Sequence, residues 1–477
     1  MSVFTPGRRW QASFRPFHKE RLGRRILARI EKWVKGPLFG CRMCGNCLLQ
    51  ETAFICPMEC PKGMRNGPCG GSSPEKCYVD ESRPCIWYRI YSRAFKMNRE
   101  EMLLEVLPPI DWDKAGTETW GDVVSQIRKF GTYKFLSSLV SQDKVKKSFA
   151  WDSVFRPVRQ PEWWAGDSLY HAPGYNEPVS DLEKELNEGN FVITAEVNPP
   201  LDSSVIKLKA KIGIVKDYVV AVNFTDSASS CPRMSSMTCS RIAAEMNVEP
   251  VFQIAARDKT RTGLQSEIIG ANANGVRNIL CISGDSPAIG PSPRGNMNIL
   301  DIDAIQMLWI LRRMRDEGVY LDGRKIANTP KLFLGAAASP FASDPKFQAL
   351  REQKKVNAGA QFLQTNLIFD KERFDDWLEE IYKRDILGKV YILAGIAPLK
   401  SLKMAEYLHN RIPGVSIHEK ILKRFRNANE NSYEEMGLEI AMEIIESLRK
   451  KQGISGIHLM SVGWVSAIPQ IVKDLEL

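Results

Sequence analysis

The chain has 477 residues, of which 44% are hydrophobic and 26% are charged. This length and composition fit a globular protein with one large domain and a smaller one, and no apolar run is long enough for a membrane span. The formal net charge of +10 is concentrated at the start of the chain, because residues 1–36 hold ten Lys and Arg against only Glu20 and Glu31.

The basic segment 1–36 also carries a helical pattern. Apolar residues recur at helical spacing between residues 19 and 33, at Leu22, Ile26, Leu27, Ile30 and Trp33. This pattern predicts an amphipathic helix with a basic face. Such a helix can pack its apolar stripe on the neighbouring module, or dock an acidic electron carrier or partner subunit. A mitochondrial presequence and nucleic-acid binding are further alternatives, although we expect no nucleic-acid partner for the chain.

Eight of the eleven cysteines lie between residues 41 and 85, in a run without histidine. Their spacing is C-x2-C-x2-C-x8-C-x3-C-x8-C-x7-C-x7-C, from Cys41, Cys44, Cys47, Cys56, Cys60, Cys69, Cys77 and Cys85. Thiolates without imidazoles suit iron–sulfur clusters or a tetrahedral zinc site. We predict one or two 4Fe-4S clusters, with zinc as the alternative in place of one cluster or of both. Disulfides are disfavoured because the arginine-rich N-terminus does not resemble a signal peptide, which also predicts a cytoplasmic protein.

Residues 100–180 form a connecting region rich in Trp and Pro. Tryptophan at this density argues for packing, because a free linker would expose it. We interpret the region as an extension of the Cys-rich module that wraps onto the next one. The predicted organisation is a basic amphipathic segment at 1–36, a Cys-rich metal domain with its Trp-rich extension at 37–180, and a final domain at 181–477.

From residue 181 the pattern changes to alternating strands and helices. Eight short runs of apolar and β-branched residues predict strands at 191–196, 218–223, 250–255, 278–283, 331–336, 362–368, 390–395 and 456–461. Helices are predicted between them at 235–246, 264–273, 302–316, 344–357, 370–384 and 433–450. This α/β pattern predicts a (β/α)8 TIM barrel, preceded by the small Cys-rich metal-cluster domain. An open doubly wound sheet is the alternative, but its usual G-x-G-x-x-G fingerprint is absent.

In a barrel, polar residues at the carboxyl ends of strands are candidates for chemistry. Glu196 ends the first predicted strand and Asp285 follows the fourth, so we expect the two carboxylates to face each other across the barrel mouth. This arrangement suits separate roles in acid and electrostatic catalysis. The structural alternative is that each caps a following helix or turn. Cys281 and His458 lie inside predicted strands and are expected to be core residues.

Several segments after residue 181 resemble methylenetetrahydrofolate reductases in order and spacing. They are TAEVNPP, AVNFTDSASSCPRMSS, LGAAASPF, KKVNAGAQFLQTNLIFD and LAGIAP, together with the G-D pair after the fourth strand. The cysteine run up to NGPCGG resembles the iron–sulfur or zinc partner subunit that acetogenic bacteria pair with this reductase. The chain therefore resembles the two proteins joined head to tail, and the likeness to the reductase covers roughly residues 181–477.

The resemblance implies reduction of 5,10-methylenetetrahydrofolate to 5-methyltetrahydrofolate through FAD bound across the barrel mouth. Glu196 matches the family's general acid, which protonates nitrogen 10 of the folate. Asp285 matches the aspartate that contacts the pterin and stabilises the developing positive charge. A partly buried glutamate suits the acid role, because burial raises the pKa of a carboxyl group.

Other matched positions are expected to hold the cofactor and the substrate. The cofactor set is Asn223, Gln253, Ser283, Ser339 and Lys355, of which Lys355 is placed to meet the FAD diphosphate; the substrate set is Asp285, Gln364 and Asn366. Many family members instead have histidine at Gln253, arginine at Ser283, tyrosine at Ser339 and glutamine at Asn366. Gln364 lies on the same strand face as Asn366 and can substitute for that glutamine.

The serine at position 339 removes the aromatic residue on which nicotinamide usually stacks, which fits electron delivery through N-terminal iron–sulfur clusters. The implied partner is an electron-donor protein, either ferredoxin-like or an NADH-oxidising subunit, within a homo- or hetero-oligomer. Two other functions stay open for this chain: a folate-binding methyl-transfer barrel and a non-catalytic, zinc-stapled assembly subunit.

Overall fold

The structure, a computed structural model, describes residues 22–287, 290–291, 300–412 and 414–475. Eight parallel strands close into a barrel in chain order, which confirms the predicted (β/α)8 fold. They are β1 (Val192–Val197), β2 (Ala221–Phe224), β3 (Pro250–Ala255), β4 (Asn278–Ile282), β5 (Phe333–Ala338), β6 (Phe362–Leu367), β7 (Tyr391–Ile396) and β8 (Gly456–Met460). In the described ranges no helix has both the length and the apolar character needed to cross a membrane.

The strands begin and end within three residues of their predicted bounds, and the largest shift is in β2. This strand starts at Ala221, because Tyr218 still belongs to the turn that ends α8 (Val205–Val215) and donates its N–H to the Val215 carbonyl at 3.0 Å. All four β2 residues are buried, as expected for a strand covered by helices on one side and barrel interior on the other.

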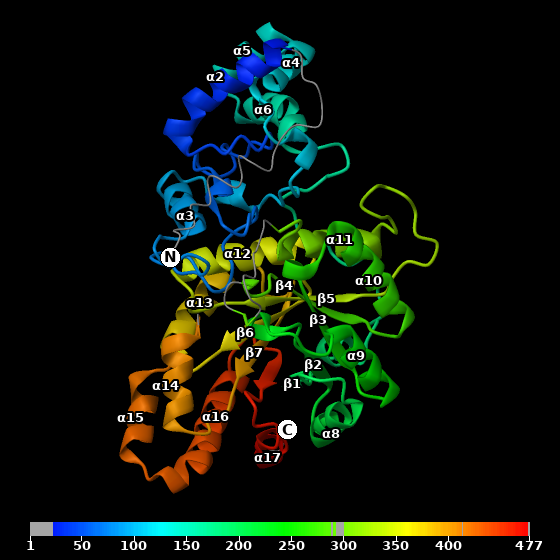
Figure 1. Cartoon of the computed structure of the whole chain (residues 1–477), viewed down its shortest axis with the longest axis vertical. Helices are drawn as coiled ribbons and strands as arrows, with labels where there is room; N and C mark the ends of the chain where they lie inside the picture. The colour runs from blue at the N-terminus through cyan, green and yellow to red at the C-terminus, as the bar shows by residue number, and fades with distance from the viewer. Residues whose placement is uncertain (1–21, 288–289, 292–299, 413, 476–477) are drawn as a thin grey trace.

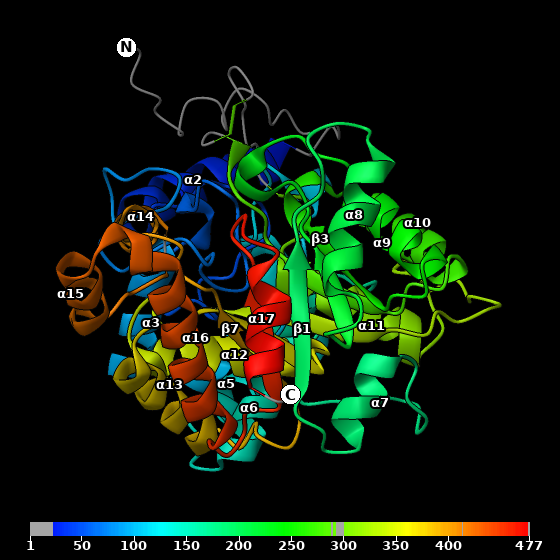
Figure 2. The ribbon, with the colours of Figure 1, turned by 90° about the horizontal axis from the view of Figure 1, so that it is seen from below.

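Helices surround the barrel on its outer side (Figure 2). The chain enters the barrel through α7 (Asp181–Asn187). The helices that follow are α8, α9 (Ser236–Glu245), α10 (Arg261–Ala273), α11 (Ala304–Asp316), α12 (Pro345–Ala358), α13 (Lys371–Lys383), α14 (Leu402–Arg411), α15 (Glu419–Asn427), α16 (Tyr433–Arg449) and α17 (Ala467–Asp474). Many have a side-chain cap, and α11 has a full capping box in which Asp303 and Gln306 satisfy each other's backbone N–H groups.

The barrel interior is apolar at the amino ends of the strands and polar above that level. Phe333 and Phe362 stack with ring centroids 4.9 Å apart, and α7 closes the floor beneath them with Leu182 and Leu186. The next layer contains His458, whose Nδ1 lies 2.9 Å from the Thr194 hydroxyl; burial lowers the pKa of His458 to about 3. His458 is therefore the core residue that the sequence predicted.

The chain before α7 forms the remaining helices, α2 (Leu22–Phe39), α3 (Ile86–Lys96), α4 (Trp120–Phe130), α5 (Thr132–Leu139) and α6 (Lys144–Arg159). Figure 1 shows α2 and α4–α6 at the end of the molecule away from α15–α17. The Trp-rich region packs on the barrel, since Trp164 stacks on Trp309 of α11 with centroids 3.9 Å apart. The domain bounds themselves stay a prediction.

The predicted basic helix is present as α2, but the expectation that its apolar stripe packs on the Cys-rich module is wrong for the residues the structure describes. Ile26, Ile30 and Trp33 are exposed, Trp33 to 79%, whereas Glu31 and Lys35 are buried. Glu31 faces inward because its carboxylate accepts hydrogen bonds from the backbone N–H and the hydroxyl of Thr119, at 2.8 and 2.6 Å. Residues 1–21 of the basic segment lie outside the described residues.

We expect Phe362→Ala to lower the free energy of unfolding by about 3–5 kcal/mol, because the buried ring stacks on Phe333 and its removal leaves a cavity in the barrel floor. Urea titration followed by far-UV circular dichroism measures this change. Tyr382→Ala on α13 is the control, since Tyr382 is 66% exposed and its loss should matter by less than about 0.5 kcal/mol. Equal losses for the two variants would show that the floor does not stabilise the barrel.

Candidate active site and thiol groups

Glu196 lies at the carboxyl end of β1, in register with Asn223 of β2 and Met460 of β8. In the part of the chain that the structure describes, its carboxylate has no hydrogen-bond or ion-pair partner. Burial alone raises the pKa of Glu196 to about 7. The group can therefore carry a proton near neutral pH, which an acid catalyst requires.

Asp285 lies on the loop after β4, three strands around the barrel from Glu196. One carboxylate oxygen accepts a hydrogen bond from the Tyr78 hydroxyl at 3.1 Å, and the other accepts the backbone N–H of Ser229 at 2.7 Å. Ser204 and Asp303 cap α8 and α11, so neither carboxylate caps the α-helix that follows its strand.

The polar layer below the mouth brings together two of the predicted ligand-binding residues. The side-chain amide of Asn223 donates to Gln364 across the barrel at 2.6 Å, and Gln364 donates back at 3.3 Å. Gln253 of β3 is buried at its register position in the same barrel. Ser283 follows β4 and accepts the Arg257 N–H through its carbonyl at 3.2 Å, while Asn366 lies near the end of β6.

Lys355 is paired inside the protein. Its ammonium group contacts the Glu352 carboxylate and the Ala337 carbonyl, each at 2.5 Å, and burial lowers the pKa of Lys355 to about 8. The other oxygen of Glu352 accepts the Ser339 N–H at 3.4 Å, so Glu352 links two predicted cofactor residues. The sequence analysis did not single out Glu352, and only its position three residues before Lys355 on a helix could have indicated the pair.

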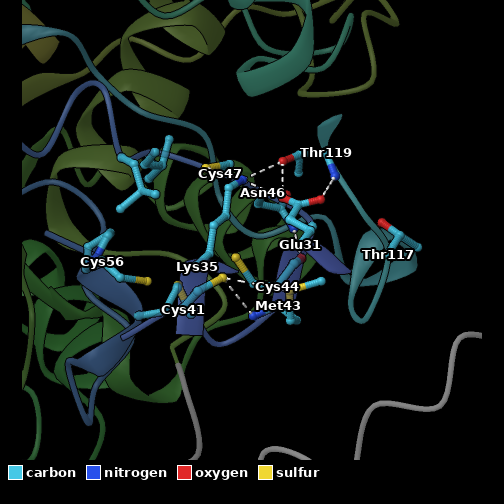
Figure 3. A pocket seen from close by; sticks show the side chains of 15 residues that line it. Glu31, Lys35, Cys41, Met43, Cys44, Asn46, Cys47, Cys56, Thr117 and Thr119 are labelled. Carbon is cyan, nitrogen blue, oxygen red and sulfur yellow. Dashed lines mark hydrogen bonds and ion pairs between the residues drawn. The ribbon is translucent and has the colours of Figure 1, made fainter. Parts of the chain in front are cut away.

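The eight clustered cysteines divide into two groups of four. The first thiol group, Cys41, Cys44, Cys47 and Cys56, surrounds a small cavity of about 20 Å3 (Figure 3). The second thiol group, Cys60, Cys69, Cys77 and Cys85, lines a cavity of about 180 Å3. All eight are free thiols. Among the described residues, no set of three or more His, Cys, Asp or Glu side chains is arranged to hold a metal ion.

Buried cations accompany the thiol groups. Lys35 pairs with Glu31, and its ammonium group lies 3.7 Å from the Cys47 sulfur (Figure 3). Arg65 is 2% exposed, yet within the described ranges its guanidinium has no carboxylate at ion-pair distance; it contacts the Pro108 carbonyl at 2.7 Å and the Met58 sulfur at 3.6 Å. A buried guanidinium without a carboxylate calls for other negative charge nearby, which metal-bound thiolates would supply.

The second thiol group borders the barrel mouth. Lys62, two residues after Cys60, donates from its ammonium group to the Gly284 carbonyl at 2.9 Å. A side chain added at Gly70 would lie 3.2 Å from the Ser339 hydroxyl. The first thiol group instead lies beside α2, through Lys35. The Cys-rich module therefore reaches from an exposed helix to the strand ends where Asp285 and Ser339 lie.

Two family models match this chain. A family model described as Methylenetetrahydrofolate reductase matches residues 181–476, and another described as Methylene-tetrahydrofolate reductase C terminal matches residues 24–113.

Methylenetetrahydrofolate reductase 2 of Schizosaccharomyces pombe is 22% identical over 62% of this chain and 47% of its own length. A probable methylenetetrahydrofolate reductase (NADPH) of Caenorhabditis elegans is 23% identical over 50% of this chain and 34% of its own length. The chain thus spans about half or less of these relatives. A solved Clostridium thermocellum protein, described as binding two copies of 5-methyl-5,6,7,8-tetrahydrofolic acid, is 15% identical with a TM-score of 0.44, over 62% of this chain and 99% of that one.

The first family model covers more than half of the chain and includes every barrel strand together with Glu196 and Asp285. The chain belongs to the methylenetetrahydrofolate reductase family.

Proposed function

We propose that this protein reduces 5,10-methylenetetrahydrofolate to 5-methyltetrahydrofolate at the barrel mouth, with FAD as its cofactor and with electrons that arrive through the Cys-rich module. The observation that carries the proposal is Glu196, a carboxyl group at the mouth whose pKa burial raises to about 7 and whose oxygens have no partner among the described residues. Such a group is free to exchange a proton with a ligand.

Glu196 acts as the general acid. In its protonated form it gives its proton to nitrogen 10 of the folate, the bond from that nitrogen to the methylene carbon breaks, and nitrogen 5 keeps the carbon as an iminium cation. Bound reduced FAD would supply the hydride that completes the methyl group. Because the folded-state pKa of Glu196 is about 7, a large fraction of the enzyme holds this proton at neutral pH.

Asp285 lies across the mouth and supplies the negative charge that the iminium cation needs. Its two carboxylate oxygens are fixed by Tyr78 and Ser229, so the charge is oriented before substrate binds. Separate acid and electrostatic roles are possible because Glu196 has no charged partner among the described residues, whereas Asp285 accepts two hydrogen bonds.

The residues present at the mouth fit a polar cofactor. The hydroxyl of Ser461, at the end of β8, is buried without a partner among the described residues, and a bound polar ligand would satisfy it. Asn223, Gln253, Ser283, Ser339 and Lys355 would hold FAD, and Gln364 and Asn366 would join Asp285 in holding the folate. Lys355 is the least supported of these, because Glu352 already neutralises it.

The two thiol groups would hold metal if their sulfurs moved closer together, because among the described residues no three of them are arranged around a metal position. Their fit is supported by four thiols around each cavity and by the buried charge of Arg65, which has no carboxylate partner among the described residues. Iron–sulfur clusters bound there would supply one-electron transfer toward the mouth. The second cavity, of about 180 Å3, leaves more room and would suit a cluster. The first group, with about 20 Å3, suits either a cluster or zinc.

The exposed face of α2 fits an acidic electron-donor protein, either ferredoxin-like or an NADH-oxidising subunit. Arg29 and Lys32 are exposed beside the apolar stripe of Ile26, Ile30 and Trp33. Exposed apolar residues beside several side chains of one charge, here positive, are typical of a surface that binds a partner of the opposite charge. The helix adjoins the first thiol group, so a donor docked there would lie beside a metal site rather than at the distant mouth.

Glu196→Gln should lower kcat for folate reduction with a reduced viologen dye about 10²–10⁴-fold, because the amide cannot donate the required proton. Binding of 5-methyltetrahydrofolate, measured by calorimetry, should be retained. In the unsubstituted protein kcat/KM should fall as pH rises through about 7, where Glu196 loses its proton, and Glu196→Gln should lack this fall. Exposed Glu188→Gln is the control. Full activity in Glu196→Gln would exclude the acid role.

Protein purified without oxygen should contain metal in two separable portions. Cys69→Ser should remove the iron and sulfide of the second thiol group, and Cys44→Ser should remove the iron or zinc of the first, because each cavity is lined by its own four thiols. Cys281→Ser, in β4, should change neither. Elemental analysis with acid-labile sulfide measures all three. Unsubstituted protein without iron or zinc would contradict metal binding.

Arg29→Glu/Lys32→Glu should slow reduction of the protein by an acidic ferredoxin about tenfold at low salt, because the variant repels the donor. The difference should shrink as ionic strength rises. Stopped-flow absorbance measures the rate, and a small viologen dye should reduce both proteins equally fast. Lys209→Glu on α8 combined with Lys216→Glu at its C-cap is the matched control, since both lysines are exposed. Equal losses in the two double variants would argue against docking on α2.

A further inference from the structure

Two residues from the Cys-rich module hydrogen-bond to the loop that carries Asp285. Tyr78 directly follows Cys77, and Lys62 follows Cys60 by two residues, so both are attached to the second thiol group. Each reaches more than 200 positions along the chain, to Asp285 and Gly284 respectively. We infer that Tyr78 is a positioning residue that orients the Asp285 carboxylate, with Lys62 fixing the backbone of the same loop; this inference rests on the proposed function.

Tyr78 is held in place on three sides. Its backbone N–H donates to the Ser72 hydroxyl at 3.1 Å, and its ring packs on Gly71, where any side chain would lie 2.7 Å from a ring carbon. The ammonium group of Lys62 lies 5.4 Å from the centre of the ring. The hydroxyl therefore meets Asp285 from a fixed direction, at 3.1 Å.

Lys62 fixes the loop through its backbone. The ammonium group donates to the Gly284 carbonyl at 2.9 Å, and the Lys62 carbonyl accepts the N–H of Leu300 at 3.0 Å, on the far side of the same β4–α11 connection. Gly284 has a φ of +74°, a conformation that glycine adopts readily and that lets the loop turn. Lys62 is 2% exposed, so solvent cannot replace these contacts.

The second carboxylate oxygen of Asp285 is bound by the barrel loop after β2, whose backbone is strained. Ser229, which donates its N–H to the second carboxylate oxygen, has a φ of 55°, and its neighbours Ser227 and Ser230 are also left-handed at 49° and 52°. Left-handed non-glycine residues are costly and persist where the surrounding structure demands them. Arg257 adds a contact from its guanidinium to the Asp285 carbonyl at 3.3 Å. One carboxylate oxygen is thus oriented by the barrel and the other by the module.

The consequence is that the Cys-rich module completes the active site. A carboxylate with only the Ser229 contact can turn about its side-chain bonds, and a turned carboxylate stabilises the substrate cation less well. The module therefore does more than deliver electrons, because the reach of Tyr78 sets the direction of the charge that faces the folate.

Tyr78→Phe tests the inference, since it removes the hydroxyl and keeps the ring. In metal-loaded, full-length protein we expect kcat/KM to fall about ten- to a hundredfold, the usual effect of losing a hydrogen bond to a charged group. In an Asp285→Asn background the same change should have little further effect, because the two residues act as a unit. Tyr88→Phe is the control: Tyr88 also joins the module to the barrel, through Gln348 at 2.9 Å, and its hydroxyl has no hydrogen bond to the described residues of the Asp285 loop.

Hydrogen–deuterium exchange of residues 283–287 supplies a readout that does not depend on catalysis. Tyr78→Phe should raise exchange in this loop at unchanged metal content, and Tyr88→Phe should not. Unchanged exchange, or a loss of activity that simply adds to that of Asp285→Asn, would overturn the positioning role. If Tyr78→Phe raises loop exchange but the unsubstituted protein neither binds nor reduces folate, the positioning of Asp285 is supported and the proposed reduction is contradicted.

Discussion

Closure of the barrel is the constraint on which the rest of the structure depends. Eight parallel strands in chain order bring every carboxyl end to one mouth, and the stacked rings of Phe333 and Phe362 fill the other end. Glu196 and Asp285 are 89 positions apart in sequence, yet closure places both on this one rim. Asn223, the register partner of Glu196, hydrogen-bonds across the barrel to Gln364 above this floor.

Charge balance explains much of the Cys-rich module. Arg65 and Lys62 are both 2% exposed, and within the described ranges neither has a carboxylate at ion-pair distance; they lie beside the thiols and the mouth. Burying such cations is unfavourable unless negative charge is nearby. Thiolates bound to metal would carry that charge, so the buried cations are consistent with the proposed metal sites. Lys35, paired with Glu31 beside Cys47, extends this pattern to α2.

The module and the barrel are joined by contacts of several kinds. Trp164 stacks on Trp309, the Asp303 carboxylate that caps α11 also accepts the backbone N–H of Arg65 at 3.2 Å, and Tyr78 reaches Asp285. The single Asp303 carboxylate thus accepts backbone N–H groups both from the first turn of α11 and from the Cys-rich module. Such shared groups make the orientation of the two parts depend on each other, as the proposed transfer of electrons from the module to the mouth would require.

The sequence by itself determined the strands and helices of the barrel, and it supplied the predictions about their chemistry. Apolar periodicity located all eight strands, because each strand is buried on both faces and its local pattern reports that burial. Cysteine spacing indicated metal, and the strand ends indicated Glu196 and Asp285. Only the tertiary structure decided how the eight thiols divide into two groups, that Glu352 neutralises Lys355, that the apolar stripe of α2 is exposed, and that Tyr78 meets Asp285. Periodicity reports whether a side chain is buried, whereas a contact between residues 207 positions apart depends on how finished elements pack, which no local pattern records.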